Sequence, residues 1–199
     1  MIKETKNALQ YAKAAHGSQL RAVGPDTGLP YFDTHVVRVT NAVIDWAKPA
    51  AALHDVIEDT HKSMSDLICT DYFTPQTLVA VDLLTQRDVE PYSDYIFRLV
   101  EGHRDYIDEY VHRYATRYLY RGDKPDWSTI VSNGRKIARR VKIADIMDNF
   151  NTLPDGPLRR KYLGGLHALT AKYTASRSKI IDAMPSLQST NPNKNDNEN

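Results

Sequence analysis

Apolar residues recur at intervals of three and four positions along most of the chain, the spacing that one face of an α-helix requires. In the first half this pattern predicts helices over residues 3–16, 34–47 and 75–86. Thr74 precedes the last of these, and threonine is a common helix cap. Residues 17–30 contain three glycines and two prolines, so they predict a loop.

The second half of the chain continues the helical pattern. Residues 135–153 predict a strong helix, and residues 157–184 predict one or two more. Residues 90–120 are helical in pattern but polar and rich in tyrosine, and residues 121–134 predict a loop. The fold class predicted from these elements is all-α, a compact multi-helix bundle.

Two segments depart from the amphipathic pattern. Tyr106, Tyr110, Tyr114 and Tyr118 recur every four residues and therefore form one stripe on their helix. Both packing of this stripe against the bundle and stacking on a nucleotide base are open as its role. Residues 185–199 have almost no apolar side chains, so they predict a disordered polar tail that follows a domain of residues 1–184.

Composition narrows the class of protein. The chain has 199 residues, of which 41% are hydrophobic and 26% are charged, as in a globular protein with a substantial core. The formal net charge of +1 gives no electrostatic support for a nucleic-acid partner. Cys69 is the only cysteine, so neither an intramolecular disulfide nor a cysteine-based zinc site is expected. With no signal-like start and no apolar run of membrane length, a cytoplasmic protein without a membrane partner is predicted.

Four polar side chains interrupt the apolar segment "AALHDVIEDT". His54 and Asp55 are adjacent. Glu58 lies one helical turn after His54, and Asp59 lies one turn after Asp55. Three carboxylates this close repel one another, and burying them without a partner would cost several kcal/mol. A divalent cation reverses that penalty, and mixed histidine and carboxylate ligands suit Mn, Fe, Zn or Ni. A solvated helix face is the alternative interpretation of this stretch.

Two other predicted helices carry side chains of the same kind. The segment "VKIADIMDN" places Asp145 and Asn149 on one helix face within an apolar frame, with Asp148 between them. His35 opens another apolar helix, where a lone histidine would otherwise be a packed core residue. Three helices that each bring metal-compatible groups into an apolar setting favour a shared metal site.

These motifs together resemble a known family. The series His35, His54-Asp55 and Asp145 is similar to the H…HD…D signature of the HD-domain metal-dependent phosphohydrolases. The stretches "AHGSQLR", "GLPYFDTH", "AALHDVIEDT", "LLTQR" and "VKIADIMDN" occur in the order and approximate spacing of the hydrolase domain of RelA/SpoT-type proteins and their small stand-alone relatives. The resemblance covers about residues 8–153.

The resemblance implies an all-α fold with one bound Mn²⁺ or another divalent transition metal. It implies four metal ligands, which are His35, His54, Asp55 and Asp145. Glu58 and Asp59 would position and deprotonate the attacking water. The small-molecule substrate implied is guanosine tetra- or pentaphosphate, which loses pyrophosphate from its 3′ position. Some stand-alone relatives instead remove a phosphate from the NADPH ribose.

Four further residues are candidates for substrate binding. Asn149 would bond the sugar or a phosphate, and Lys142 and Arg21 would meet a phosphate or the base. Tyr31 is a fourth candidate. For Lys142 and Arg21 an ordinary surface or packing role is equally open, and Tyr31 is alternatively a core aromatic.

The chain also departs from the family pattern. Ala22 stands where RelA/SpoT-type domains usually have a further basic residue, and Val36 stands in place of the usual proline. The chain has an insert at roughly residues 101–134 relative to the smallest relatives. This insert could form a lid, reshape the pocket or make a homo-oligomer interface. A phosphatase of NADPH or nucleoside monophosphates, and a nucleotide sensor without turnover, are the alternative functions.

Overall fold

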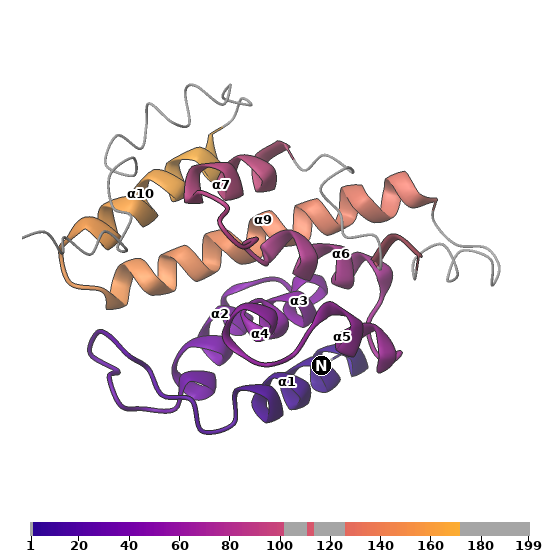
Figure 1. Ribbon diagram of the computed structural model, residues 1–199, viewed down its shortest axis with the longest axis horizontal. Helices are drawn as coiled ribbons and strands as arrows, with labels where there is room; N and C mark the ends of the chain where they lie inside the picture. The colour runs from indigo at the N-terminus through magenta and orange to yellow at the C-terminus, as the bar shows by residue number, and fades with distance from the viewer. Residues whose placement is uncertain (1, 102–110, 114–125, 172–199) are drawn as a thin grey trace, which may run out of the picture.

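The computed structural model describes residues 2–101, 111–113 and 126–171 (Figure 1). These residues form helices joined by turns and loops, and no β-strand occurs among them, so the predicted all-α fold is confirmed. The helices are α1 (Lys3–His16), the π-helix η1 (Phe32–Val36), α2 (Val37–Ala42), the 3₁₀ helix η2 (Asp45–Ala47), α3 (Lys48–Leu53), α4 (Val56–Asp59), α5 (Met64–Cys69), α6 (Pro75–Leu84), α7 (Tyr92–Glu101), α9 (Trp127–Thr152) and α10 (Pro157–Thr170).

The long helix α9 runs through the middle of the bundle, as Figure 1 shows. On one side it contacts α7 and α10, which also contact each other. On the other side it contacts α6, α2 and α3, and α1 covers α3 from outside. A residue on α9 can therefore meet partners from helices on either side of it.

The core is densest where α6 and α9 meet. Helix α6 is buried on almost every side, and Leu78 and Val79 have no exposed surface. Gly134 of α9 allows the close approach, because a Cβ atom there would lie only 2.4 Å from Cγ1 of Val79. The nearly continuous apolar composition of α6 is typical of a helix surrounded by others.

Three predicted helix boundaries are corrected by the structure. Residues 127–134 belong to α9, since the Asp126 carboxylate accepts a hydrogen bond from the Thr129 backbone N–H at 2.8 Å and caps the helix there. The single helix predicted for residues 34–47 is divided among η1, α2 and η2, because Val43 leaves α2 in an extended conformation. The helix predicted over residues 75–86 ends at Leu84.

Several predictions fall outside the described residues. The tyrosine stripe is among them, as are most of the insert and the whole of the predicted tail at residues 185–199. The loop predicted at residues 17–30 is confirmed, apart from an isolated bridge between Leu20 and Pro30.

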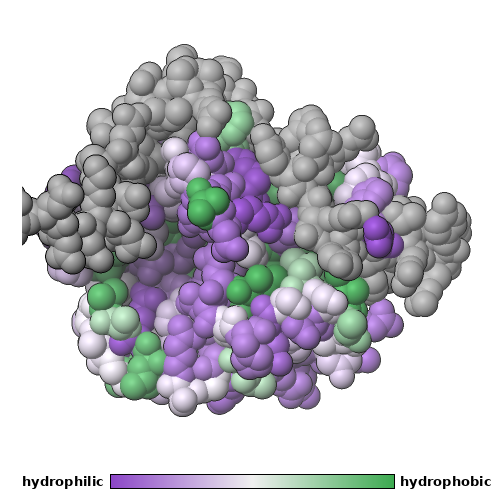
Figure 2. Space-filling model, in the orientation of Figure 1, coloured by the Kyte–Doolittle hydropathy of each residue, from purple (hydrophilic) through white to green (hydrophobic). Residues whose placement is uncertain are grey.

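The surface shown in Figure 2 is mainly hydrophilic, and its hydrophobic residues form small separate groups. No helix within the described residues combines the length and the apolar character needed to cross a membrane.

Candidate metal centre and adjoining cavity

The "HD" pair lies in a turn between two helices. Helix α3 ends at Leu53 and α4 begins at Val56, so the continuous helix expected here is broken by His54 and Asp55. The backbone N–H of Asp59 still donates to the carbonyl of Asp55 at 2.8 Å, which keeps the two helices almost continuous. His54 contacts Asp145 of α9, and Asp55 contacts His35 of η1.

Four side chains from three parts of the chain converge at this turn. The Nε2 atoms of His35 and His54 are 3.3 Å apart, and Oδ2 of Asp55 lies 3.3 and 2.9 Å from them. From α9, Oδ1 of Asp145 lies 3.3 Å from Nε2 of His35 and 3.8 Å from Nε2 of His54. Ligand atoms of His35, His54 and Asp145 therefore lie within 4.8 Å of one another, and Asp55, the fourth predicted ligand, contacts both histidines. Ligand atoms about 2.1 Å from a single ion are separated by roughly 3.0–3.4 Å, which is close to these distances.

When the two imidazole rings are neutral, their tautomers make this cluster a set of acceptors. Nδ1 of His54 lies 2.8 Å from the Ala51 carbonyl oxygen, which can only accept, so Nδ1 carries the proton. Nδ1 of His35 lies 2.7 Å from Oδ2 of Asp148 and donates in the same way. In the neutral rings both Nε2 atoms then present lone pairs toward two carboxylates. Buried acceptors that face one another in this way could hold a cation, and histidine nitrogens with carboxylate oxygens are a donor set that suits a divalent transition metal.

Without a metal ion, protons on the two imidazole rings supply the positive charge between the carboxylates. Burial alone would lower the pKa of His35, but its hydrogen bonds to Asp145, Asp148 and Asp55 outweigh burial and raise that pKa to about 9. Burial likewise opposes protonation of His54, and the charge of Asp55 raises its pKa well above the usual value. A metal ion and the imidazole protons therefore compete for the same site.

A cavity of about 250 Å³ opens beside the cluster. It lies between the HD turn, α9 and α10, and two of the proposed ligands, Asp55 and Asp145, form part of its wall. It is lined by Arg21, Val23, Tyr31, Asp55, Glu58, Asp59, Gln86, Tyr92, Lys142, Asp145, Asn149, Leu153, Leu158, Lys161 and Tyr162. Every residue predicted to act on or bind the substrate is in this lining.

Glu58 and Asp59 supply two carboxylates of the cavity that lie outside the proposed ligand set. Burial raises the pKa of Glu58, whose Oε1 accepts a hydrogen bond from the Gln86 backbone N–H. Burial and the neighbouring charge of Asp55 raise the pKa of Asp59, which also accepts from the Gln19 side chain at 3.4 Å. A carboxylate with a raised pKa beside a cation site is suited to accept a proton from water.

The cationic residues of the cavity form a network around the proposed ligands. Lys142 is buried, and its Nζ lies 2.8 Å from Oδ2 of Asp145, the oxygen that does not face the histidines. Asn149 donates to Oδ1 of Asp145 at 2.7 Å, and its own Oδ1 accepts from Arg21 at 2.8 Å. Lys142 and Asn149 thus contact Asp145 directly, and Arg21 contacts it through Asn149, while all three residues also line the cavity.

Tyr31 is neither a free cavity residue nor a plain core aromatic. Its hydroxyl donates to Oδ2 of Asp55, the oxygen that faces both histidines. Burial, followed by the charge of Asp55, raises the pKa of this phenol, so the hydroxyl stays protonated and remains a donor. Tyr31 therefore orients a proposed ligand from the cavity side.

The sequence did not single out several residues that contact the cluster or line the cavity. Asp148 accepts a hydrogen bond from Nδ1 of His35, the ring nitrogen that faces away from the cluster. The Nε–H of Arg38 in turn donates to Asp148 at 2.6 Å. Lys161 and Tyr162 bring α10 into the cavity wall. Asp148 belongs to the segment "VKIADIMDN", three residues after Asp145. Its role could not be predicted, because it depends on which helix packs against that face of α9.

Fold and site together define a helical protein with a candidate transition-metal centre at the edge of a charged cavity. Searches of protein-family models and of curated proteins find no match to this chain.

Proposed function

We propose that the chain is a divalent-metal-dependent phosphohydrolase of the HD type that acts on a phosphorylated nucleotide. The observation that carries the proposal is the set of contacts of 2.9–3.8 Å among His35, His54, Asp55 and Asp145, with the carboxylates of Glu58 and Asp59 in the adjoining cavity. The family resemblance of the sequence motifs supports Mn²⁺ as the ion and a cytoplasmic nucleotide as the substrate.

The residues would divide the chemistry among them. A divalent ion held by the four ligands would lower the pKa of a water molecule and polarise a phosphate oxygen. Glu58, with Asp59 beside it, accepts the proton of the attacking water, because burial has raised the pKa of both carboxyls. Lys142 and Lys161 offset the negative charge of the phosphate in the cavity, and Tyr31 keeps the Asp55 carboxylate turned toward the cluster.

Guanosine tetra- or pentaphosphate is the substrate that we favour, with loss of the 3′-pyrophosphate. The family resemblance supports this choice, and so do the two lysines and the arginine that line the cavity. A second candidate is a smaller substrate, such as a nucleoside monophosphate. It is favoured by the cavity volume of about 250 Å³, which is below the roughly 300–1,000 Å³ of pockets that enclose drug-sized ligands.

Turnover of guanosine tetraphosphate, NADPH and nucleoside monophosphates, measured with and without added Mn²⁺, tests the proposal. We expect metal-dependent release of pyrophosphate or phosphate, and we expect Glu58→Gln to lower kcat by about 10²–10⁴-fold while Mn²⁺ still binds. Asp33→Asn is the matched control, because Asp33 is an exposed carboxylate outside the cavity, and it should retain full activity. Binding of a nucleotide without turnover of any would overturn the enzyme proposal in favour of a sensor.

A further inference from the structure

The two histidines of the cluster are supported differently. His54 donates from Nδ1 to the Ala51 carbonyl, an oxygen of the backbone one turn earlier in the same segment. His35 donates from Nδ1 to a side chain on another helix, the Asp148 carboxylate of α9, at 2.7 Å. The orientation of the His54 ring therefore depends on local backbone structure, whereas that of the His35 ring depends on a tertiary contact.

Asp148 is itself held in place by Arg38. The guanidinium of Arg38 donates from Nε to Oδ1 at 2.6 Å and from Nη2 to Oδ2 at 3.1 Å, so the pairing uses both carboxylate oxygens. Both oxygens of Asp148 accept from the guanidinium, so the carboxylate presents only acceptors to the His35 N–H.

Arg38 ties this contact to the helix that carries His35. Arg38 lies three residues after His35, and its Nη1 donates at 2.7 Å to Asp26 in the loop before η1. Asp148 follows Asp145 by three residues on α9, so each of the two segments supplies one proposed ligand and one member of the supporting pair. The pair thus joins the two ligands through their own helices.

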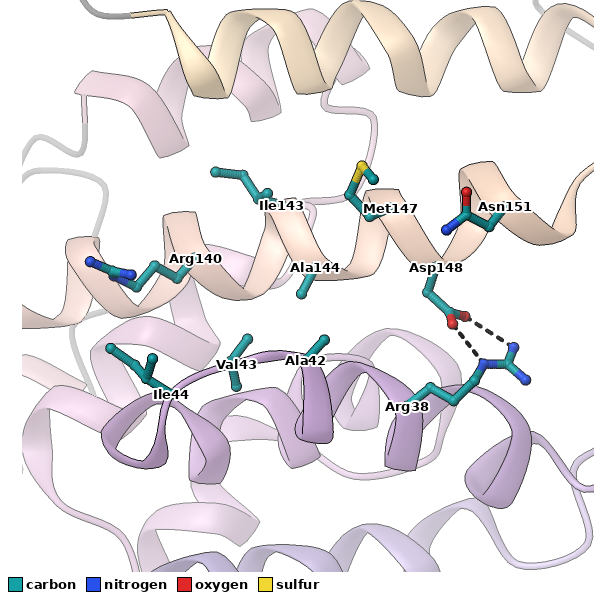
Figure 3. Close-up of a pocket in the computed structure, with 10 residues that line it drawn as sticks. All are labelled: Arg38, Ala42, Val43, Ile44, Arg140, Ile143, Ala144, Met147, Asp148 and Asn151. Atoms are coloured by element: carbon teal, nitrogen blue, oxygen red, sulfur yellow. Dashed lines mark hydrogen bonds and ion pairs between the residues drawn. The ribbon is translucent and has the colours of Figure 1, made fainter.

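The space beside the pair is open, as Figure 3 shows. A groove of about 460 Å³ lies between α2 and α9, with apolar residues such as Ala42 and Ala144 along its floor. Arg38 and Asp148 lie at one end of the groove and Arg140 at the other (Figure 3). Because side chains do not fill this seam, hydrogen bonds carry more of the positioning there than packing does.

We propose that Arg38 and Asp148 are positioning residues for the metal centre, which fix the orientation and the tautomer of His35 and thereby set the affinity for the ion. This inference rests on the proposed metal site. Arg38 acts through Asp148, and Asp148 acts through the Nδ1–H of His35. Outer contacts of this kind typically change metal affinity by about 10–100-fold when they are removed.

The test is titration of Mn²⁺ into the full chain after removal of bound metal, with the dissociation constant read by calorimetry. Asp148→Ala is expected to weaken binding by about 10–100-fold. Asp148→Asn keeps an acceptor for the His35 N–H, so its affinity should lie between those of Asp148→Ala and the wild type. Arg38→Met should weaken binding in the wild type but cause no further loss in the Asp148→Ala background.

A control separates positioning from a general effect of charge or folding. Arg140→Met removes the same charge from the other end of the groove, and it should bind Mn²⁺ as the wild type does. Thermal unfolding of each metal-free variant identifies any that do not fold, and Asp148→Asn and Arg38→Met then carry the test.

The outcomes distinguish the inference from the function on which it rests. Wild-type protein that binds no Mn²⁺ would overturn both. Tight binding by the wild type with equally tight binding by Asp148→Ala would overturn the positioning role alone. Additive losses from Arg38→Met and Asp148→Ala would also overturn it, because they would mean that Arg38 does not act through Asp148.

Discussion

Helix α9 meets the rest of the bundle along two seams that are held together in different ways. Against α6 the contact is apolar and close, with Gly134 facing Val79. Against α2 the contact borders the 460 Å³ groove, and at one end of this groove Arg38 of α2 pairs with Asp148 of α9. We call these the tight seam and the polar seam.

The difference separates a contact that stabilises the fold by packing from a contact that orients a proposed metal ligand. The tight seam is packed mainly by buried apolar side chains such as Leu78 and Val79, which favours close approach of the two helices. The polar seam holds the second ring nitrogen of His35 and the charged groups behind it. A side chain that must face a cation at a defined angle needs directional hydrogen bonds, and apolar packing does not supply direction.

The largest contrast expected between the seams is in their response to pH. The pKa of His35 is raised from 6.5 to about 9 in the folded, metal-free protein. A group with a raised folded-state pKa stabilises fully below its unfolded value, and the stabilisation is lost as pH rises through the folded value. The metal-free protein should therefore lose stability between about pH 6.5 and pH 9, whereas the apolar contact of Gly134 with Val79 in the tight seam has no titratable group.

Urea denaturation at a series of pH values, with a chelator present, measures this effect. The midpoint should fall from pH 6.5 to pH 9, and added Mn²⁺ should reduce the fall, because the ion replaces the imidazole protons. A midpoint that stays constant or rises over this range would contradict the charge assignment of the cluster.

Truncation of one side chain in each region should give unequal losses of stability. Val79 has no exposed surface in the tight seam, so Val79→Ala should lower the free energy of unfolding by about 1.5–3 kcal/mol. Met147 lines the groove and is 41% exposed, so Met147→Ala should cost less than about 1 kcal/mol. Equal losses in chemical denaturation would show that the two seams do not differ in packing.

A smaller effect is expected when the tight seam is overfilled. The Cβ atom of Gly134→Ala would clash with Val79, at a cost of about 1–3 kcal/mol, while the gain in helix propensity is only about 1 kcal/mol. The net result should be a loss of roughly 1 kcal/mol in thermal or chemical unfolding. A stabilised Gly134→Ala protein would mean that α6 and α9 are farther apart than described.

Helices and the members of the cluster were largely predictable from the sequence. The apolar spacing predicted α1 and placed α6 and most of α9, because these helices bury one face or all of their surface. His35, His54, Asp55 and Asp145 stood out as polar residues in apolar frames, and the structure brings them together.

The supporting contacts were less accessible to sequence reasoning. Asp126 caps α9 within a stretch that looked like a loop, and one capping carboxylate is a weak signal among polar residues. The break at His54 and Asp55 leaves no mark in the apolar pattern. Asp148 and Arg38 are 110 positions apart, and their contact depends on how α2 and α9 pack.

The central claim is that His35, His54, Asp55 and Asp145 bind one divalent cation. A crystal structure of the protein with Mn²⁺, with anomalous diffraction used to locate the ion, tests this claim most directly. The account predicts one anomalous peak per chain, about 2.0–2.3 Å from Nε2 of both histidines and from a carboxylate oxygen of each aspartate. A site without such a peak at saturating Mn²⁺, or a peak held by other residues, would contradict it.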